Sequence, residues 1–239
     1  MSLTTAPFEE RKDVLFIGNM NHLPNQDAVS WYVTRIHHLV REKQHNCLLH
    51  IVGTPVHYIP EWIRENAKNL GVNILGYVKD VRPLFNSVLA TVAPLRFGAG
   101  VKGKIGQSLA YGVPVVSTAV GAEGMHLTGL EVGIGRDERE FARVITSLHQ
   151  NKTYWEMLRT GGQRVIKEKY SKEAAMQGIQ KILRKAEHAV PCQLERTMKR
   201  RFTPTTSEEP GTQEYPSFVD RSRTRPPRSR RRTEVSRGW

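Results

Sequence analysis

The segment PLRFGAGVKGKIGQSLAYGVPVVS, residues 94–117, carries the clearest structural signal in this chain. The apolar, β-rich run at residues 88–93 leads into it and predicts a strand, which a glycine-rich stretch then interrupts. Residues 103–111 have a helical pattern that a Gly-Val-Pro sequence stops, and residues 113–117 predict a second strand. The segment therefore predicts a strand, a glycine loop, a short helix and a further strand.

This glycine loop has the features of an anion-binding site. Gly98 and Gly100 allow the backbone to approach a ligand closely, and the free N–H groups of the following helix point outward with the positive end of its dipole. Lys102 and Lys104 add full positive charges beside those donors. A phosphate or diphosphate would fit, but a glycine-lysine loop is also consistent with a well-solvated turn. The loop lacks the GK[ST] of a P-loop and is not a dinucleotide-binding GxGxxG.

The composition of the 239-residue chain changes near residue 187. We predict an N-terminal extension at residues 1–12, one folded domain at residues 13–186, and a disordered basic tail at residues 187–239 that is rich in Arg, Pro, Ser and Thr. The formal net charge is +13, and 12 basic and 7 acidic residues lie from Glu187 onward. A basic chain suits an acidic small ligand or an anionic membrane surface. The arginine-rich end of the tail predicts no specific nucleic-acid contact.

Cysteine content and hydropathy favour a cytoplasmic protein. The strongest membrane association that they allow is peripheral contact with the inner face of the membrane. Cys47 and Cys192 are too few for a disulfide framework and too isolated for a metal site. Neither a signal peptide nor a run of 18 apolar residues is present in the sequence.

Five short apolar segments alternate with helical ones and predict an α/β fold, a single doubly wound parallel sheet with C-terminal helices. In such a sheet the loops after the strands gather at the carboxyl ends, where ligands bind. Asn25 is the predicted N-cap of the helix that follows the first strand. The five strands are predicted at residues 13–17, 47–52, 72–75, 88–93 and 113–117, and the gathering loops at 18–22, 76–80, 96–104 and 119–125.

The C-terminal part of the predicted domain is helical. A weak strand at residues 131–134 precedes helices at residues 137–149, 152–170 and 171–185. The predictions also place Trp31, Trp62 and Trp155 in the core or an interface, and His37, His38 and His45 on the surface.

The ordered motifs resemble the C-terminal, donor-binding half of a GT-B glycosyltransferase of the GT4 type, also called group 1. The resemblance covers about residues 8–186. The motifs that carry it are FIGNM at residues 16–20, PNQDAV at 24–29, PLRFGAGVKGK at 94–104, GVPVVST at 112–118 and GAEGM at 121–125.

The resemblance implies a retaining transfer of a sugar from a nucleotide-diphosphate donor, with no cofactor and no metal. Lysine and arginine charges would neutralise the leaving diphosphate instead of a metal. The implied donor-binding residues lie in the gathering loops and in the helix after the glycine loop, and no catalytic residue is implied. They are Asn19, Tyr77, Val78, Arg96, Gly98, Gly100, Val101, Lys102, Gly103, Lys104, Gln107 and Glu123.

Two departures from the family pattern leave alternatives open. Many relatives carry two glutamates eight positions apart, where this chain has Ala99 and Gln107; Gln107 can still hydrogen-bond a ribose hydroxyl, but Ala99 cannot. The N-terminal acceptor half of the family is also absent from this sequence. The chain is then a fragment, a subunit that works with a separately encoded N-terminal half, or a non-catalytic, degenerate half that binds another protein.

Overall fold

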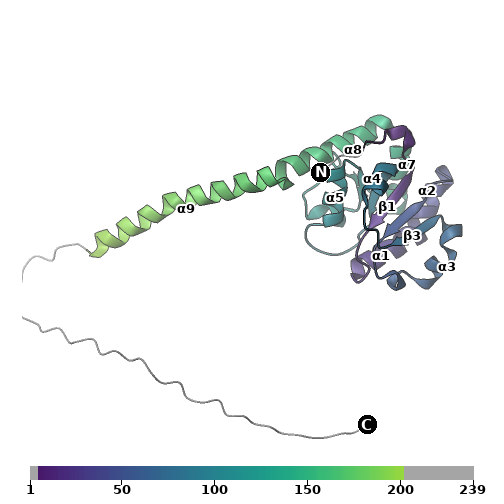
Figure 1. The fold of residues 1–239 in the computed structure, drawn as a ribbon, viewed down its shortest axis with the longest axis horizontal. Helices are drawn as coiled ribbons and strands as arrows, with labels where there is room; N and C mark the ends of the chain where they lie inside the picture. Colours follow the sequence, from purple (N-terminus) through teal and green to yellow (C-terminus); the bar gives the residue numbers. More distant parts are fainter. Residues whose placement is uncertain (1–4, 202–239) are drawn as a thin grey trace, which may run out of the picture. The chain divides into compact units, whose positions relative to one another are not determined.

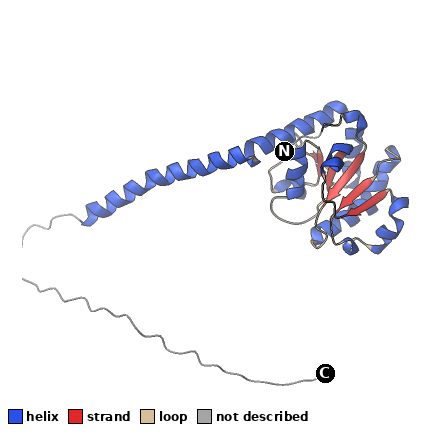
Figure 2. Cartoon of the chain, viewed as in Figure 1, coloured by secondary structure: helices blue, strands red, loops and turns tan. Residues whose placement is uncertain are grey.

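The computed structural model describes residues 5–201, with side chains described through residue 186. Its centre is a six-stranded sheet in the order β3-β2-β1-β4-β5-β6, and every strand pair is parallel (Figures 1 and 2). This confirms the predicted doubly wound α/β fold. The strands are β1 (Asp13–Ile17), β2 (Leu49–Val52), β3 (Val72–Gly76), β4 (Val88–Ala93), β5 (Val115–Ser117) and β6 (Gly133–Ile134).

Helical segments connect successive strands. Those of the first half are η1 (Phe8–Glu10), α1 (Leu23–Trp31), η2 (Tyr32–Ile36), α2 (His37–Lys43), η3 (Val56–Tyr58), α3 (Glu61–Leu70) and α4 (Arg82–Ser87). Those of the second half are α5 (Gly103–Tyr111), α6 (Ala119–Glu123), α7 (Glu138–Gln150), α8 (Lys152–Val165), η4 (Ile166–Tyr170) and α9 (Lys172–Arg201).

Both faces of the sheet are covered, because successive side chains of its central strands enter different clusters. Val14 and Phe16 of β1 belong to a large core cluster that also holds Phe141 of α7. Leu15, between them, belongs to a cluster on the other side with Phe85 of α4. A strand buried on both faces reads as a continuous apolar run, which is why DVLFI was recognisable in the sequence.

The N-terminal extension is attached to the rest of the domain from residue 5 onward. The backbone N–H groups of Thr5 and Ala6 donate to the Asn86 side chain. The Arg11 guanidinium is buried, donates to the backbone carbonyls of Phe85 and Val88, and lies over the Trp155 ring. Burial lowers the pKa of Arg11 to about 10. These contacts attach the extension to the domain.

Several local predictions were wrong. Asn25 does not cap α1, because the helix begins at Leu23 with a proline in its first turn and His22 as its N-cap residue. His37 is not a surface residue but is buried, with its Nε2 atom 3.1 Å from the carbonyl oxygen of Gly71. Trp62 is 41% exposed and belongs to no core cluster, which excludes the core but leaves the predicted interface untested, whereas Trp155 is buried as predicted.

The last helix is longer than predicted. Ser171 is extended and separates η4 from α9, which runs from Lys172 to Arg201 instead of ending near residue 185. Residues 187–201 are therefore helical, whereas the composition predicts them to be the start of a disordered tail. Residues 202–239 of that predicted tail lie outside the described residues. In the part of the chain that the structure describes, no helix is long and apolar enough to cross a membrane.

Candidate functional site

The topology selects one edge of the sheet as the ligand-binding edge. β1 and β4 are neighbours, but the chain passes from β1 to β2 on one side and from β4 to β5 on the other. The loops that follow β1 and β4 therefore diverge at the carboxyl end of this strand pair, the position at which doubly wound sheets bind ligands. The loop after β4 is the glycine loop, here taken as residues 94–102.

The glycine loop leaves its backbone open to a ligand. Gly98 and Gly100 have φ angles of 111° and 79°, in the region that favours glycine. A Cβ atom at Gly100 or Gly103 would meet no atom within 4 Å. No side chain caps the start of α5, and the N–H of Ile105 donates to the carbonyl oxygen of Lys102, so the N–H groups of Gly103 and Lys104 remain available to another acceptor.

Lys104, in the first turn of α5, is a largely buried cation that contacts the helix and the strand of the β1 side of the site. Its Nζ atom donates to Asn25 Oδ1 at 2.5 Å and lies 4.2 Å from the centre of the Phe16 ring. The narrow space beside it, bordered by Ile17 and Thr91 among others, has no room for a water molecule. Burial, with the nearby charge of Lys102, lowers the pKa of the Lys104 amine to about 7.

Asn25 joins the two loops of the site. Its Nδ2 atom donates to the carbonyl oxygen of Asn19 at 2.7 Å, while its Oδ1 accepts from Lys104. Gly18 gives this contact its room, because a Cβ atom there would lie 2.9 Å from the Asn25 side chain. The loop after β1 is thus connected to α5 through a single buried amide.

Lys102 and Arg96, the two cations of the glycine loop itself, also have partners within the protein. Lys102 Nζ donates to the carbonyl oxygens of Gly98 and Gly100, each at 2.8 Å, which folds this side chain back over its own loop. Arg96 forms an ion pair with Asp27 of α1, and its guanidinium lies 5.6 Å from the centre of the Trp31 ring. Each of these cations is at the site, and a bound anion would have to share or replace these partners.

Most of the remaining predicted residues lie around the same edge. Asn19 is exposed in the loop after β1, and Val101 is 59% exposed in the glycine loop. Gln107 is half-buried one turn along α5. Glu123 is exposed at the end of α6, where Gly124 packs so closely that its Cβ would lie 2.1 Å from the carbonyl oxygen of Gly100.

Tyr77 and Val78 stand apart from this group. They follow β3, which β2 separates from β1 in the sheet. The side chain of Tyr77 is 77% exposed, whereas Val78 packs against the core cluster that contains Phe85. The structure thus brings together the loops after β1, β4 and β5, and leaves the loop after β3 farther along the edge.

Sequence reasoning missed the role of three residues at this site. The sequence predicts Asn25 as a helix cap and does not identify Phe16 or Asp27 as a partner of a cation. The available signal was the sequence PNQDAV at residues 24–29, because it places an amide and a carboxylate on the first turns of the helix that leaves β1. The partners of these side chains come from a segment far along the chain.

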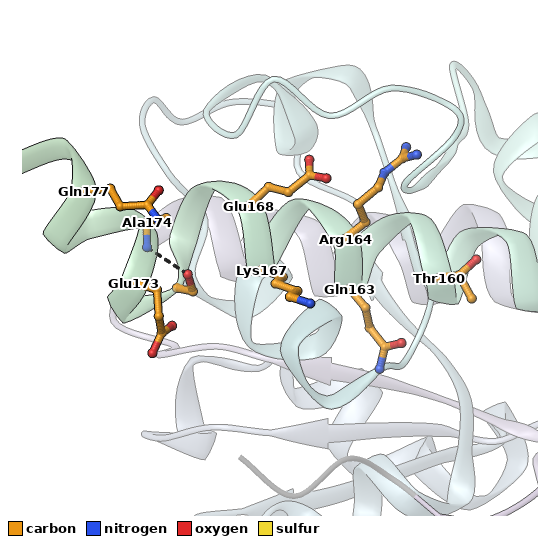
Figure 3. A pocket seen from close by; sticks show the side chains of 9 residues that line it. Thr160, Gln163, Arg164, Lys167, Glu168, Glu173, Ala174 and Gln177 are labelled. Atoms are coloured by element: carbon orange, nitrogen blue, oxygen red, sulfur yellow. Dashed lines mark hydrogen bonds between the residues drawn. The ribbon is translucent and has the colours of Figure 1, made fainter. Parts of the chain in front are cut away.

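A groove of about 790 Å³ lies elsewhere, along α8, η4 and the start of α9 (Figure 3). It is lined by Thr160, Gln163, Arg164, Lys167, Glu168, Ser171, Glu173, Ala174 and Gln177. We favour the strand-end loops over this groove as the functional site, because the loops combine cations with free backbone donors. Among the described residues, no three His, Cys, Asp or Glu side chains gather as a metal site would require.

Comparisons with known proteins agree with the family resemblance and the fold. Residues 11–151, more than half of the chain, match the family model described as Glycosyl transferases group 1. A curated protein of Klebsiella pneumoniae, named as an uncharacterized 44.6 kDa protein in the cps region, is 25% identical over 173 residues. That match covers 70% of this chain and 45% of the relative, so the chain spans less than half of the relative's length.

Solved structures share the fold at low sequence identity. TarM of S. aureus is 18% identical with a TM-score of 0.62, over 76% of this chain and 37% of TarM. Anabaena HepE, solved in complex with UDP, is 14% identical with a TM-score of 0.56, over 74% of this chain and 50% of HepE. The C-terminal domain of the group 1 protein LpcC from Francisella tularensis is 11% identical with a TM-score of 0.52, over 68% and 87%.

Proposed function

Because this chain belongs to the group 1 glycosyltransferase family, we propose that its α/β domain binds a nucleotide-diphosphate sugar as the donor for a sugar transfer. The observation that carries the proposal is the open glycine loop at the carboxyl ends of β1 and β4, with Lys102 and Lys104 beside it. Cations and free amides at such an edge suit a diphosphate. Anabaena HepE, which shares the fold, was solved with UDP.

In the proposed complex, the diphosphate lies against the glycine loop and the first turn of α5. The open space beside Gly100 and Gly103 admits phosphate oxygens to the backbone N–H groups. Lys102 exchanges the two backbone carbonyls that it now contacts for a phosphate oxygen, a stronger, charge-assisted partner. Lys104 supplies a second charge from beneath the loop.

The remaining predicted residues take the outer parts of the donor. We assign the nucleotide base to the backbone of Tyr77 and Val78, and a ribose hydroxyl to Gln107. The sugar and its surroundings fall to Asn19, Arg96, Val101 and Glu123. No metal or cofactor enters this proposal, since the lysines and the helix dipole neutralise the leaving diphosphate as it gains charge.

We further propose the GT4 subtype, a retaining reaction, a cytoplasmic location and an N-terminal half of the enzyme that supplies the acceptor site. The cytoplasmic location rests on the cysteine content and hydropathy of the sequence. The other points rest on the motif resemblance and on the fact that the chain spans less than half of its curated relative. Sugar transfer by this domain would then require that second half.

Isothermal titration with UDP, GDP and ADP sugars tests donor binding directly. We expect binding heat with one of these classes, and a loss of about 1.5–3 kcal/mol of binding free energy in the Lys102→Ala variant, the usual value of a charged hydrogen bond. Lys68→Ala, which removes an exposed lysine of α3, is the matched control and should bind as the wild type does. A folded sample that releases no heat with any donor contradicts the proposal.

A second candidate function is that of a non-catalytic half that binds another protein. The contacts of Arg96, Lys102 and Lys104 within the protein favour it, because all three cations have partners without a ligand. Ala99, in place of a glutamate, points the same way. A stable protein partner in a pull-down, together with silent titrations, would decide for this function over the first.

A further inference from the structure

Asn25 is a buried amide with both of its ends engaged at the proposed donor site. It is 9% exposed, its Oδ1 atom accepts from Lys104 Nζ, and its Nδ2 atom donates to the carbonyl oxygen of Asn19. A flipped amide would bring its N–H donors against the lysine amine and its oxygen against a carbonyl, so these contacts fix its orientation. A Cβ atom at Gly18 would lie 2.9 Å from the Asn25 side chain and 3.0 Å from Lys104 Nζ. The two side chains are therefore packed in one fixed arrangement.

This contact leaves the charge of Lys104 without an opposite charge in the protein. Among the described residues no carboxylate forms an ion pair with the amine, whose partners are Asn25 and the Phe16 ring. The neighbouring charge is the like charge of Lys102, which adds to burial in lowering the pKa of the amine. The other residues that line the space beside the amine are uncharged, namely Ile17, Thr91, Val92, Ala93, Ile105 and Val115. The amine is thus held in place but not neutralised.

A second cation of the site has a carboxylate as its partner on the same helix. Asp27, two positions after Asn25, forms an ion pair with Arg96, and this hydrogen-bonded contact raises the pKa of Arg96. Helix α1 therefore gives a carboxylate to Arg96 and a neutral amide to Lys104. A diphosphate that approached a lysine-carboxylate pair would have to displace the carboxylate, whereas an amide leaves the full charge of the amine for a ligand.

We infer that Asn25 is a positioning residue of the donor site: its neutral amide holds the Lys104 amine in place without neutralising it, so that the donor diphosphate supplies the opposite charge. This inference rests on the proposed donor binding and adds to it the residue on which the protonation of the lysine depends. Near neutral pH the free chain holds part of its Lys104 amines uncharged, and a diphosphate favours the charged form. Donor binding should therefore be accompanied by the uptake of a proton.

NMR titration of the full chain with isotope-labelled lysine tests the role of Asn25 without a donor. The Lys104 signal, assigned by its loss in Lys104→Met, should titrate with a midpoint at about pH 7 in the wild type. Asn25→Asp should raise this midpoint by about one pH unit or more, because a carboxylate favours the charged amine. Asn25→Leu, which is similar in size and accepts no hydrogen bond, should lower it. The matched control is Asn66→Asp, which adds the same charge at an exposed position of α3 and should leave the midpoint unchanged.

Titration calorimetry with a sugar nucleotide, in HEPES and in Tris, then measures proton uptake, because the two buffers differ in ionisation enthalpy. The wild type should take up about half a proton per donor at about pH 7.5, since most of its free amine is neutral there. Asn25→Asp should take up almost none. It should also bind the donor about tenfold more weakly at about pH 6, where the diphosphate has to displace the new carboxylate. An amide with a merely structural role would change the affinity but not the proton uptake.

The outcomes separate this inference from the donor-binding function. Unchanged Lys104 midpoints in both Asn25 variants would overturn the inference, and so would wild-type proton uptake in a folded Asn25→Asp variant that still binds the donor. Far-UV circular dichroism verifies folding, and Asn25→Leu carries the test if the aspartate variant does not fold. If the midpoint shifts with residue 25 but the wild type binds no sugar nucleotide, the donor-binding function fails and the control of the amine by Asn25 stands.

Discussion

If the domain binds a donor as proposed, the ammonium group of Lys104 predicts that this binding depends on pH within the physiological range. Its pKa is lowered to about 7 by burial, so the amine is charged below that pH and neutral above it. Because a diphosphate binds better to a charged amine, donor affinity should fall as the pH rises. We expect the Kd for the donor sugar to increase by about tenfold between about pH 6 and about pH 8.5, as measured by titration calorimetry.

The controls for this prediction come from the same chain. Lys104→Met should bind the donor weakly at both pH values and lose the pH dependence. Lys68→Met, at an exposed position of α3, should retain it. Nucleotide sugars are suitable ligands because their phosphates do not titrate in this range, unlike a free nucleoside diphosphate. A wild-type affinity that is flat across the range would show that the amine does not contact the diphosphate.

A second buried group, His37, makes the stability of the domain sensitive to acid. Burial lowers the pKa of its imidazole to about 4, whereas the unfolded chain protonates it near 6.5. As the pH falls below about 6.5 the unfolded state gains a proton that the folded state does not take up, so stability is lost. We expect His37 to account for a loss of about 2 kcal/mol in the free energy of unfolding between about pH 7.5 and about pH 5.

Urea unfolding at the two pH values measures this effect. His37→Gln removes the titrating group and should reduce the acid loss by that amount. His38→Gln, its exposed neighbour, should leave the loss unchanged. Equal acid sensitivity in the wild type and the His37 variant would contradict the assignment.

The two titrating residues show what a sequence conceals at this scale. His37 and His38 are adjacent, and only the direction of α2 relative to the sheet decides which one is buried. Lys104 is desolvated by Phe16 and held by Asn25, which come from elements far away in the chain. The glycine loop identified the lysines as candidates for the site, but their partners depend on the tertiary fold.

At the scale of the element, α5 depends on a glycine at its end. Gly112 has a φ angle of 74°, which turns the chain out of the helix and back toward β5. Gly112→Ala places a side chain in that conformation, with its Cβ 2.4 Å from the Gln163 side chain. We expect a loss of about 1–2 kcal/mol in the free energy of unfolding, measured by urea titration.

The same helix provides the control at its other end. A Cβ atom at Gly103 would meet no atom within 4 Å, and the φ angle of Gly103 is not positive. The unfolding free energy of Gly103→Ala should therefore stay within about 0.5 kcal/mol of the wild-type value. Equal destabilisation by the two substitutions would mean that the loss reflects general helix disruption and not the turn at Gly112.

For elements with strong local signals at their ends, the predicted first and last residues agree with the structure. β1, β4 and α5 have the predicted limits, because glycine or a change of periodicity marks both ends. Two strands, β2 and β5, begin two residues later than predicted. For α9, the periodicity of Ile179, Ile182 and Leu183 predicted the helix correctly but does not reveal whether other parts of the chain cover its apolar face.

At the scale of the whole molecule, the proposed site exists only in the folded sheet. β1 positions Phe16 and the loop with Asn19, α1 positions Asn25, and α5 positions Lys104. These residues are separated by up to 88 positions in the sequence, and their convergence follows from the crossover order of the strands. An unfolded chain brings none of these groups together, so it should have no measurable affinity for the donor.

This difference between the folded and unfolded states predicts that the donor stabilises the domain. With the sugar nucleotide at about 100 times its Kd, the free energy of unfolding should rise by about 2.7 kcal/mol, since the ligand binds the folded state alone. Urea unfolding with and without donor measures the shift, and it requires no acceptor and no catalytic turnover. At the same donor concentration the Lys102→Ala variant should show a shift of only about 0.3–1.3 kcal/mol, because the expected loss of about 1.5–3 kcal/mol raises its Kd. If no sugar nucleotide stabilised the wild-type chain even at millimolar concentration, the donor-binding function would fail whatever reaction the family performs.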